Sequence, residues 1–186
     1  MDIFDTITAR RSIKRFTDRA ISEESIQKML SMAVLAPNHR MTEPWRFYVL
    51  GPEARAAYGH ALGLRKAKRV EDPQAAQDVV EKVSATHRAL PAMLAVSMMR
   101  DENPEILEED YAATYMAIQN LCLAACAMGL GTHVKTGAIM DDPNGRSAVG
   151  AGEGERIVAT ISLGEPADMP APISRQSAAD LTKWVP

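Results

Sequence analysis

Residues 36–50, APNHRMTEPWRFYVL, decide how the N-terminal part of the chain folds. Pro37 and Asn38 begin a polar stretch typical of a turn, whereas residues 45–50 form the apolar, aromatic run typical of a buried strand. Pro37 also ends the helical pattern that precedes it. Between the two halves lie a histidine, an arginine and a glutamate. The stretch is compatible with an ordinary loop that leads into a strand, and with a loop whose side chains hold a ligand against the end of that strand.

Helices and strands occur in a mixed order on both sides of this stretch. Ser22, followed by Glu23 and Glu24, indicates a helix start, because serine caps the first amide groups and acids suit the positive end of the helix dipole. Apolar spacing predicts helices over 2–10, from 22 to the loop at Pro37, 52–64, 75–87 and 104–130, and a short one after 143–145. Apolar or β-branched runs predict strands over 45–50, 93–99, 131–138 and 156–163. No linker or repeat is apparent, so we expect one α+β domain over residues 1–186.

The segment 104–130 is unusual because apolar residues occur on nearly all sides of the expected helix. Such a helix is buried in a core or against a partner subunit, and the small size of the domain favours the partner. The tail after Gly164 is interrupted by prolines and ends in a short amphipathic piece around Leu181 and Trp184. A tail of this kind packs poorly on itself and is expected to wrap another surface.

The composition is that of an ordinary globular protein. The chain has 186 residues, 46% hydrophobic and 24% charged, with a formal net charge of −3, which gives no reason to expect a general polyanion binder. No apolar run approaches the roughly 20 residues that a membrane helix needs. The N-terminus lacks the apolar core of a signal peptide, so we expect a cytoplasmic protein that binds neither membranes nor nucleic acid.

Several kinds of chemistry lack the residues that they need. Cys122 and Cys126 lie four positions apart on an expected helix, where a disulfide is seldom possible, and we expect small buried hydrophobic residues. No two of the four histidines have the spacing of metal ligands, so no metal site is expected. No serine elbow or activated cysteine supplies a hydrolase nucleophile. If the protein is an enzyme, a cofactor carries the chemistry.

The strongest charged cluster is ARRSIKRF, residues 9–16. Its cations and its serine suit a phosphate, which guanidinium groups bind in a bidentate manner. Taken alone, the cluster is also compatible with a solvated basic turn, which is the commoner case. A second basic run, residues 65–69, lacks interleaved aromatics and is expected to be a solvated helix end or a mobile lid.

Two histidines have open roles. His39 could be a general acid, a stacking group or a surface imidazole, and the residues alone favour the surface. His133 follows Gly131 at the start of a strand and could line a site or be a half-buried structural residue. Gly129 and Gly131, after the long helix, allow a left-handed helix cap and a close approach of the backbone.

Four blocks occur in one order along nearly the whole chain: ARRSIKRF (9–16), APNHRMTEPWRF (36–47), AIQNLCLAACAMGLGTHVKTG (117–137) and ATISLGEP (159–166). Each block alone is a weak signal. Together and in this order they resemble the FMN-dependent nitroreductase family, most closely its minimal short-chain bacterial branch. The resemblance implies a nitroreductase-like fold, with a central, mostly antiparallel sheet flanked by helices, and an intertwined homodimer with FMN in two clefts at the subunit interface.

The resemblance also assigns cofactor-binding residues, position by position. It implies that the flavin phosphate and ribityl chain are held by Arg10, Arg11, Ser12 and Lys14. It places Pro37, Asn38 and His39 near the isoalloxazine ring, from the partner subunit, and Val134, Lys135 and Thr136 at its border. Arg175 falls where many members have a phosphate-binding residue. No side chain is assigned a catalytic role.

One residue departs from the family pattern: Glu43 stands where the family usually has glutamine before Pro-Trp. A carboxylate cannot donate hydrogen bonds as an amide does, so a Glu43 facing the flavin would disfavour the anionic reduced cofactor or alter substrate preference. The alternative is an ion pair of Glu43 with Arg40 or Arg46, which we favour.

The resemblance implies ping-pong chemistry. NAD(P)H delivers hydride to flavin N5 and leaves, and an oxidant such as a nitroaromatic, a quinone or an activated alkene takes its place. Two other functions stay open: a flavin-binding protein with little turnover, for storage or regulation, and unusual flavin chemistry on the same scaffold. Residues 64–90 are where a substrate lid could lie.

Overall fold

The computed structural model describes residues 1–186 and shows an α+β fold, as the sequence predicts. The helices are α1 (Ile3–Ala9), α2 (Glu23–Ala33), α3 (Pro52–Ala67), α4 (Pro73–Arg88), α5 (Pro104–Ala127) and α6 (Pro143–Val149). The strands are β1 (Trp45–Val49), β2 (Ala92–Met99), β3 (Gly131–Lys135) and β4 (Glu155–Gly164). Two 3₁₀ turns, η1 (Ala138–Asp141) and η2 (Ala179–Leu181), complete the regular structure. No helix is both long and apolar enough to cross a membrane.

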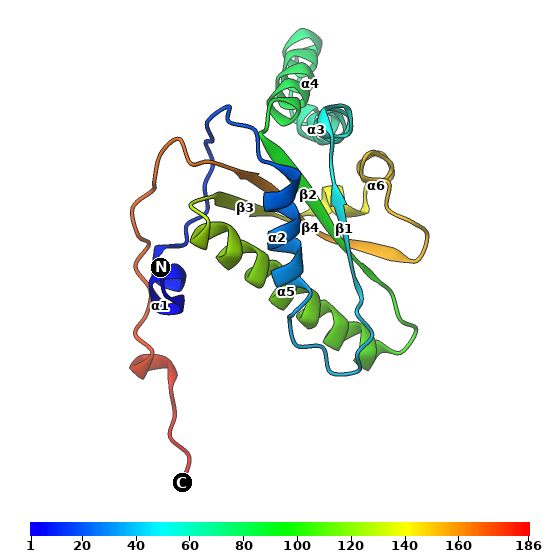
Figure 1. The fold of residues 1–186 in the computed structure, drawn as a ribbon. Coiled ribbons are helices and arrows are strands. Elements are labelled where there is room, and N and C mark those ends of the chain that lie inside the picture. Colours follow the sequence, from blue (N-terminus) through cyan, green and yellow to red (C-terminus); the bar gives the residue numbers. More distant parts are fainter.

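The four strands form one antiparallel sheet in the order β1-β2-β4-β3, with helices on both faces (Figure 1). Alternate residues of β2 point to opposite faces. Leu94, Val96 and Met98 belong to the core shared with α2 and α5, whereas Met93 and Ala95 pack with residues of α3, α6 and η1. The long helix α5 thus covers one face of the sheet and leaves part of its own surface to solvent.

The helix ends follow from their capping residues. The Ser22 side chain accepts from the Ser25 amide and begins α2, as predicted. The Asn103 side chain accepts from the Glu105 amide at the start of α5. That helix ends before Gly129, which has a φ of +74°, and the Leu130 amide donates to the Ala125 carbonyl at 2.8 Å. The glycine cap predicted after the long helix is therefore confirmed.

Residues 64–90 form part of a tight helical hairpin. The helix predicted to end at 64 continues to Ala67, and α4 packs closely along it because two glycines of α3 face α4. A Cβ at Gly63 would lie 2.8 Å from the Val80 Cα, and one at Gly59 would lie 2.8 Å from the His87 Cβ. The close backbone contact leaves α3 and α4 no room to slide along each other. The basic run 65–69 forms the end of α3 and the short turn that follows it.

One predicted strand is shorter than expected, and the expectation for the two cysteines is confirmed. The strand predicted over 131–138 ends at Lys135, because Gly137 has a φ of +123° and turns the chain into η1. Cys122 is buried and Cys126 half-buried, and both are free thiols, in agreement with the expectation of small apolar residues.

A buried carboxylate joins β1, β2 and β4 at the bulge between Val96 and Ser97. Glu155 is only 9% exposed and accepts hydrogen bonds from the Tyr48 hydroxyl at 2.8 Å and from the Ser97 hydroxyl. Burial alone would raise the pKa of Glu155, but the hydrogen bonds from Ser97 and Tyr48 outweigh it and the pKa is lowered. The native state therefore favours the ionised form.

Replacing Glu155 with glutamine is expected to lower the free energy of unfolding by about 1–3 kcal/mol at pH 7, because two buried hydroxyls lose a charged acceptor. The lowered pKa sets the pH dependence. The stabilisation by the ionised Glu155 is complete above the ordinary glutamate pKa near 4.5. It is lost as the pH falls through the lowered pKa of Glu155 in the folded state. Urea unfolding at pH 7 and at acidic pH measures both effects. Glu153→Gln, at an exposed neighbouring position, is the control, and equal midpoints for the two variants would contradict this role.

Candidate functional site

The basic segment 10–16 is an extended chain that lies along the outer edge of β3. Ser12 forms a parallel bridge with Thr132, and the Ile13 amide donates to the Thr132 carbonyl at 2.9 Å. Ile13 is buried against Gly131, where a Cβ would come within 2.8 Å of the Ile13 Cβ. The glycine thus permits the close approach that the sequence suggested, and the approach places the basic side chains beside the strand.

A second contact holds the other end of this segment. Phe16 packs against Gly164, where a Cβ would lie 2.9 Å from the Phe16 Cδ1, and the Thr17 amide donates to the Glu165 carbonyl at 2.9 Å. The Arg15 guanidinium pairs with Asp168 at 2.6 Å. Because both ends are docked on the sheet, the positions of Ser12 and Lys14 between them are set by the fold.

Apart from Arg15, which pairs with Asp168, the cations at this edge have no acidic partners. Lys14, Lys135 and His133 form no ion pair in the structure. Burial and the neighbouring charge of Lys66 lower the pKa of Lys135, while burial, Lys135 and Lys14 lower the pKa of His133. The one carboxylate in the adjoining hollow, Asp168, is paired with Arg15. Positive groups that repel one another and form no ion pair favour an anionic ligand.

The two adjacent arginines at the start of the segment differ. Arg10 forms no ion pair or side-chain hydrogen bond with the rest of the chain, whereas Arg11 donates to the Thr8 and Arg10 carbonyls at 2.6 and 3.0 Å and covers the end of α1. The Arg11 Nε is buried without a partner. Arg10 is therefore the half-buried guanidinium whose donors have no partner within the chain.

Two hollows flank the segment. One of about 350 Å³ is lined by Ser12, Lys14, Arg15, Asp168 and Pro170. The other, of about 130 Å³, lies under Arg10 and Arg11 and reaches Cys122 and Cys126 on α5. On β3, Val134 packs against the core, Lys135 is half-buried and Thr136 is exposed just after the strand. The structure thus brings the first predicted group, Arg10 to Lys14, together with the β3 group.

The loop with Pro37, Asn38 and His39 lies at the opposite end of α5 (Figure 1). The His39 Nδ1 lies 3.0 Å from a Glu109 oxygen, and the Arg40 Nε donates to the other Glu109 oxygen at 3.0 Å. Arg40 also pairs with Glu105 at 2.9 Å. Hydrogen bonds from His39 and Arg40 lower the pKa of Glu109, so this carboxylate is ionised at neutral pH.

A polar cluster around the buried Asp110 shapes the same loop. The Asn38 side-chain oxygen accepts from the Glu43 amide at 2.7 Å, and the Asn38 amide group donates to Thr42 at 3.1 Å. Thr42 in turn donates to Asp110, which is only 4% exposed. Met41 and Glu43 have φ values of +51° and +45°. Such left-handed residues cost on the order of 1–3 kcal/mol each and persist only where the surroundings impose them. The loop is therefore preorganised.

The predicted ion pair of Glu43 is wrong. Arg40 pairs with Glu105 and Glu109, and the Arg46 guanidinium donates to the backbone carbonyl of Glu43 at 3.0 Å. The Glu43 carboxylate forms no ion pair. The acids that take up Arg40 come from α5, more than sixty positions away in the sequence, so the local pattern did not reveal them.

One chain does not bring the two groups together. His39 contacts Glu109 near the start of α5, whereas Arg10 and Arg11 share a hollow with Cys126 near its end. At 1.5 Å per residue, Glu109 and Cys126 are about 25 Å apart. Arg175 lies in an exposed tail and joins neither group. A site that combines all these residues requires a second copy of the chain.

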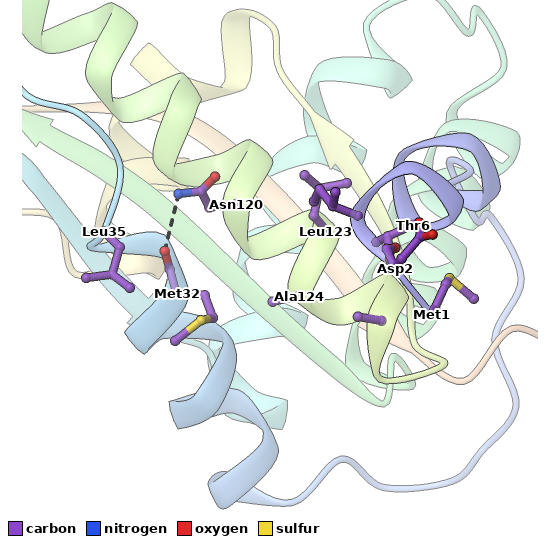
Figure 2. Close-up of a pocket in the computed structure, with 10 residues that line it drawn as sticks. Met1, Asp2, Thr6, Met32, Leu35, Asn120, Leu123 and Ala124 are labelled. Carbon is purple, nitrogen blue, oxygen red and sulfur yellow. Dashed lines mark hydrogen bonds between the residues drawn. The ribbon is translucent and has the colours of Figure 1, made fainter.

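The face between the two groups is apolar and open. A hollow of about 370 Å³ lies between α1, α2 and α5. Figure 2 shows Met32 of α2 and Leu35, just after that helix, opposite Leu123 of α5. Asn120 donates to the Met32 carbonyl at 3.3 Å beside it. Large apolar side chains around it are more than half exposed: Met1, Ile3, Phe4, Ile7 and Leu35. An apolar surface of this kind is typical of an interaction site.

Three residues near the predicted groups were not identified from the sequence. Glu109 and Asp110 position the loop from a helix whose pattern reads as apolar, and their acidity within that pattern is the only local signal. His87 looked unremarkable but is 5% exposed, with its Nδ1 2.8 Å from the Val83 carbonyl and its Nε2 without a partner. Burial lowers the pKa of His87.

Comparison with known proteins shows what the chain resembles. A model of the Nitroreductase family matches residues 7–165. YfhC of Bacillus subtilis, named "Putative NAD(P)H nitroreductase", is 36% identical over 169 residues, which cover 89% of this chain and 85% of YfhC. The crystal structure of a nitroreductase-like family protein from Bacillus cereus has a TM-score of 0.87 at 28% identity, covering 100% of this chain and 96% of that one. The crystal structure of a "putative nitroreductase" from Desulfovibrio desulfuricans, in complex with FMN, has a TM-score of 0.74 at 25% identity. The match covers 98% of this chain and 96% of that one.

Proposed function

Because the chain belongs to the nitroreductase family, we propose that it is an FMN-dependent oxidoreductase that passes electrons from NAD(P)H to a small organic acceptor. Relatives named as NAD(P)H nitroreductases and a similar structure in complex with FMN support this assignment. The acceptor is a nitroaromatic, a quinone or an activated alkene, and donor and acceptor use the site in turn, in a ping-pong sequence.

The observation that carries the proposal is the uncompensated positive charge along β3. Arg10, Ser12 and Lys14 present two cations and a free hydroxyl, and Lys135 adds a half-buried ammonium group from the strand. A phosphate needs this donor set, because charge-assisted hydrogen bonds to its oxygens offset the repulsion among the cations. The residues present therefore fit FMN, with its phosphate at Arg10, Arg11, Ser12 and Lys14.

The proposed site is shared by two chains. Pro37, Asn38 and His39 of one copy would complete the site at Arg10 to Lys14 and at Val134, Lys135 and Thr136 of the other. The exposed apolar face of α1, α2 and α5 gives a second copy a surface to cover, and the tail 167–186 is exposed throughout. A two-fold axis would form two equal sites from one interface. Arg175, on the tail, is the residue that a partner could bring to the phosphate.

FMN, when bound, supplies the hydride chemistry. The chain's own residues hold the phosphate, fix the ring position with the backbone of residues 134–136, and keep water away with the apolar face of α5. Lys135 places positive charge beside the cofactor, which favours a reduced, anionic form over the neutral oxidised form.

The test is to purify the protein, record its visible spectrum, and add NADH and NADPH separately without oxygen. We expect a yellow protein that bleaches with one or both donors and recovers its colour when a quinone or a nitroaromatic is added. A colourless protein that FMN does not reconstitute would overturn the assignment. A yellow protein that neither donor bleaches would instead be a flavin-binding protein with little turnover.

A further inference from the structure

His39 is the one titratable side chain that the loop presents to a hollow at the start of α5. That hollow, of about 370 Å³, is lined by Pro37, Asn38, His39, Glu109 and, from α5, Ala112, Ala113 and Met116. Apart from His39 and Glu109, its walls carry no charged group. The imidazole is thus the only proton donor of this hollow, and its 70% exposed side chain leaves it accessible to a ligand.

Glu109 determines how this ring is oriented. Because a carboxylate only accepts, the 3.0 Å contact between the His39 Nδ1 and Glu109 Oε1 requires a proton on Nδ1. The Nε2 lies across the ring and points away from Glu109. Arg40 donates to the second oxygen of Glu109 at 3.0 Å and to Glu105 at 2.9 Å, so the carboxylate itself is held in place.

We propose that His39 delivers a proton from Nε2 to the acceptor during its reduction, and that Glu109 is the positioning residue that makes this possible. The proposal rests on the proposed function. It adds to that function a proton donor from the chain, where solvent would otherwise serve. Met41 and Glu43 have left-handed backbone conformations, and contacts with Asn38 and Asp110 hold the loop in that shape. A loop that is fixed at this cost in energy supports a role for His39 that needs a defined position.

The proton balance can be written for a quinone. Hydride supplied by the reduced cofactor adds two electrons and one proton, and one quinone oxygen is left as an anion. The Nε2–H bond of the protonated His39 breaks, its electron pair stays on Nε2, and the proton forms an O–H bond with that oxygen. The quinone is reduced to the hydroquinone, the cofactor is oxidised, and His39 takes a new proton from solvent. Glu109 balances the positive ring before the transfer.

The first test reads the ring directly and needs no turnover. In ¹⁵N-labelled protein, with and without FMN, long-range ¹H–¹⁵N spectra above the ordinary imidazole pKa of about 6.5 distinguish the two neutral tautomers. His39→Gln assigns the His39 signals among the four histidines. We expect the Nδ1–H tautomer in the wild type and a shift toward Nε2–H in Glu109→Gln. The same tautomer in both proteins would overturn the positioning role.

The second test compares two acceptors on the same anaerobically reduced samples. Ferricyanide takes electrons without a proton, whereas a benzoquinone needs one. The ratio of quinone to ferricyanide rates is expected to fall about 100-fold in His39→Gln, the lower end of the range for general acid catalysis, and less, about tenfold, in Glu109→Gln, which keeps the imidazole. Glu108→Gln, an exposed neighbour on the same helix, is the matched control and should keep the wild-type ratio.

An unchanged ratio in His39→Gln would overturn the proposal even if the wild type is a competent reductase. Failure of NAD(P)H to reduce the wild-type protein would contradict the proposed function instead, and the two failures are therefore distinguishable.

Discussion

Replacing Gly131 with alanine is expected to lower the free energy of unfolding by about 1–3 kcal/mol and to weaken FMN binding at the same time. The added Cβ would lie within 2.8 Å of the Ile13 Cβ, which belongs to a stiff, β-branched and buried side chain. Ile13 cannot turn away, so the backbone of residues 12–14 has to move off β3. Because this backbone carries Ser12 and Lys14, stability and cofactor binding are lost together.

Urea unfolding and FMN titration of Gly131→Ala measure the two losses. Gly51→Ala is the control, because a Cβ there meets nothing within 4 Å and its φ of −67° suits alanine. The double variant with Ile13→Ala removes the Ile13 Cγ1 and Cγ2 atoms, which would lie 2.4 and 3.1 Å from the new Cβ, and so relieves part of the overlap. It should be more stable than the sum of the single changes predicts, by at least about 0.5 kcal/mol. Additive effects would show that Ile13 is not what Gly131 accommodates.

Replacing Arg10 with alanine is expected to weaken FMN binding by about 1.5–3 kcal/mol, the scale of a hydrogen bond to a charged group, or roughly 10- to 150-fold in Kd. Arg10 forms no ion pair or side-chain hydrogen bond within the chain, so its loss should have little effect on the fold itself. Fluorescence titration of the apoprotein with FMN measures the change, and thermal unfolding without FMN measures the stability.

The control for Arg10→Ala is Arg69→Ala, which removes the same charge from the exposed turn after α3. A fall in affinity that is equal in both variants would mean a general charge effect and would contradict the phosphate assignment. Riboflavin, which lacks the phosphate, gives a second comparison. Arg10→Ala should alter riboflavin binding much less than FMN binding.

Local sequence signals predicted the elements of this fold well. The Ser22 cap, the apolar runs at 93–99 and 156–163, and Gly129 after α5 each act within a few residues, and the structure has the corresponding helix starts, strands and helix end. The strand predicted to 138 stops at Lys135 because Gly137, not the apolar pattern, decides where the chain turns.

Local sequence patterns did not predict the contacts between distant parts of the chain. The pairing of Arg40 with Glu105 and Glu109 depends on where α5 crosses the loop, and the buried setting of His87 depends on the close packing of α3 and α4. The location of Arg10 to Lys14 beside β3 was suggested only by resemblance. Its physical cause, the missing side chain of Gly131, became clear from the packing.

The distance of about 25 Å along α5 between Glu109, which contacts His39, and Cys126, which shares a hollow with Arg10, has a thermodynamic consequence. If each cofactor touches two chains, cofactor binding and chain association are linked equilibria, and each strengthens the other by the same factor. FMN would then be lost on dilution to concentrations at which the chains separate, and free FMN would raise the apparent association constant. In a cell, a low supply of flavin would leave separated chains, whose apolar faces are open to other partners or to quality control.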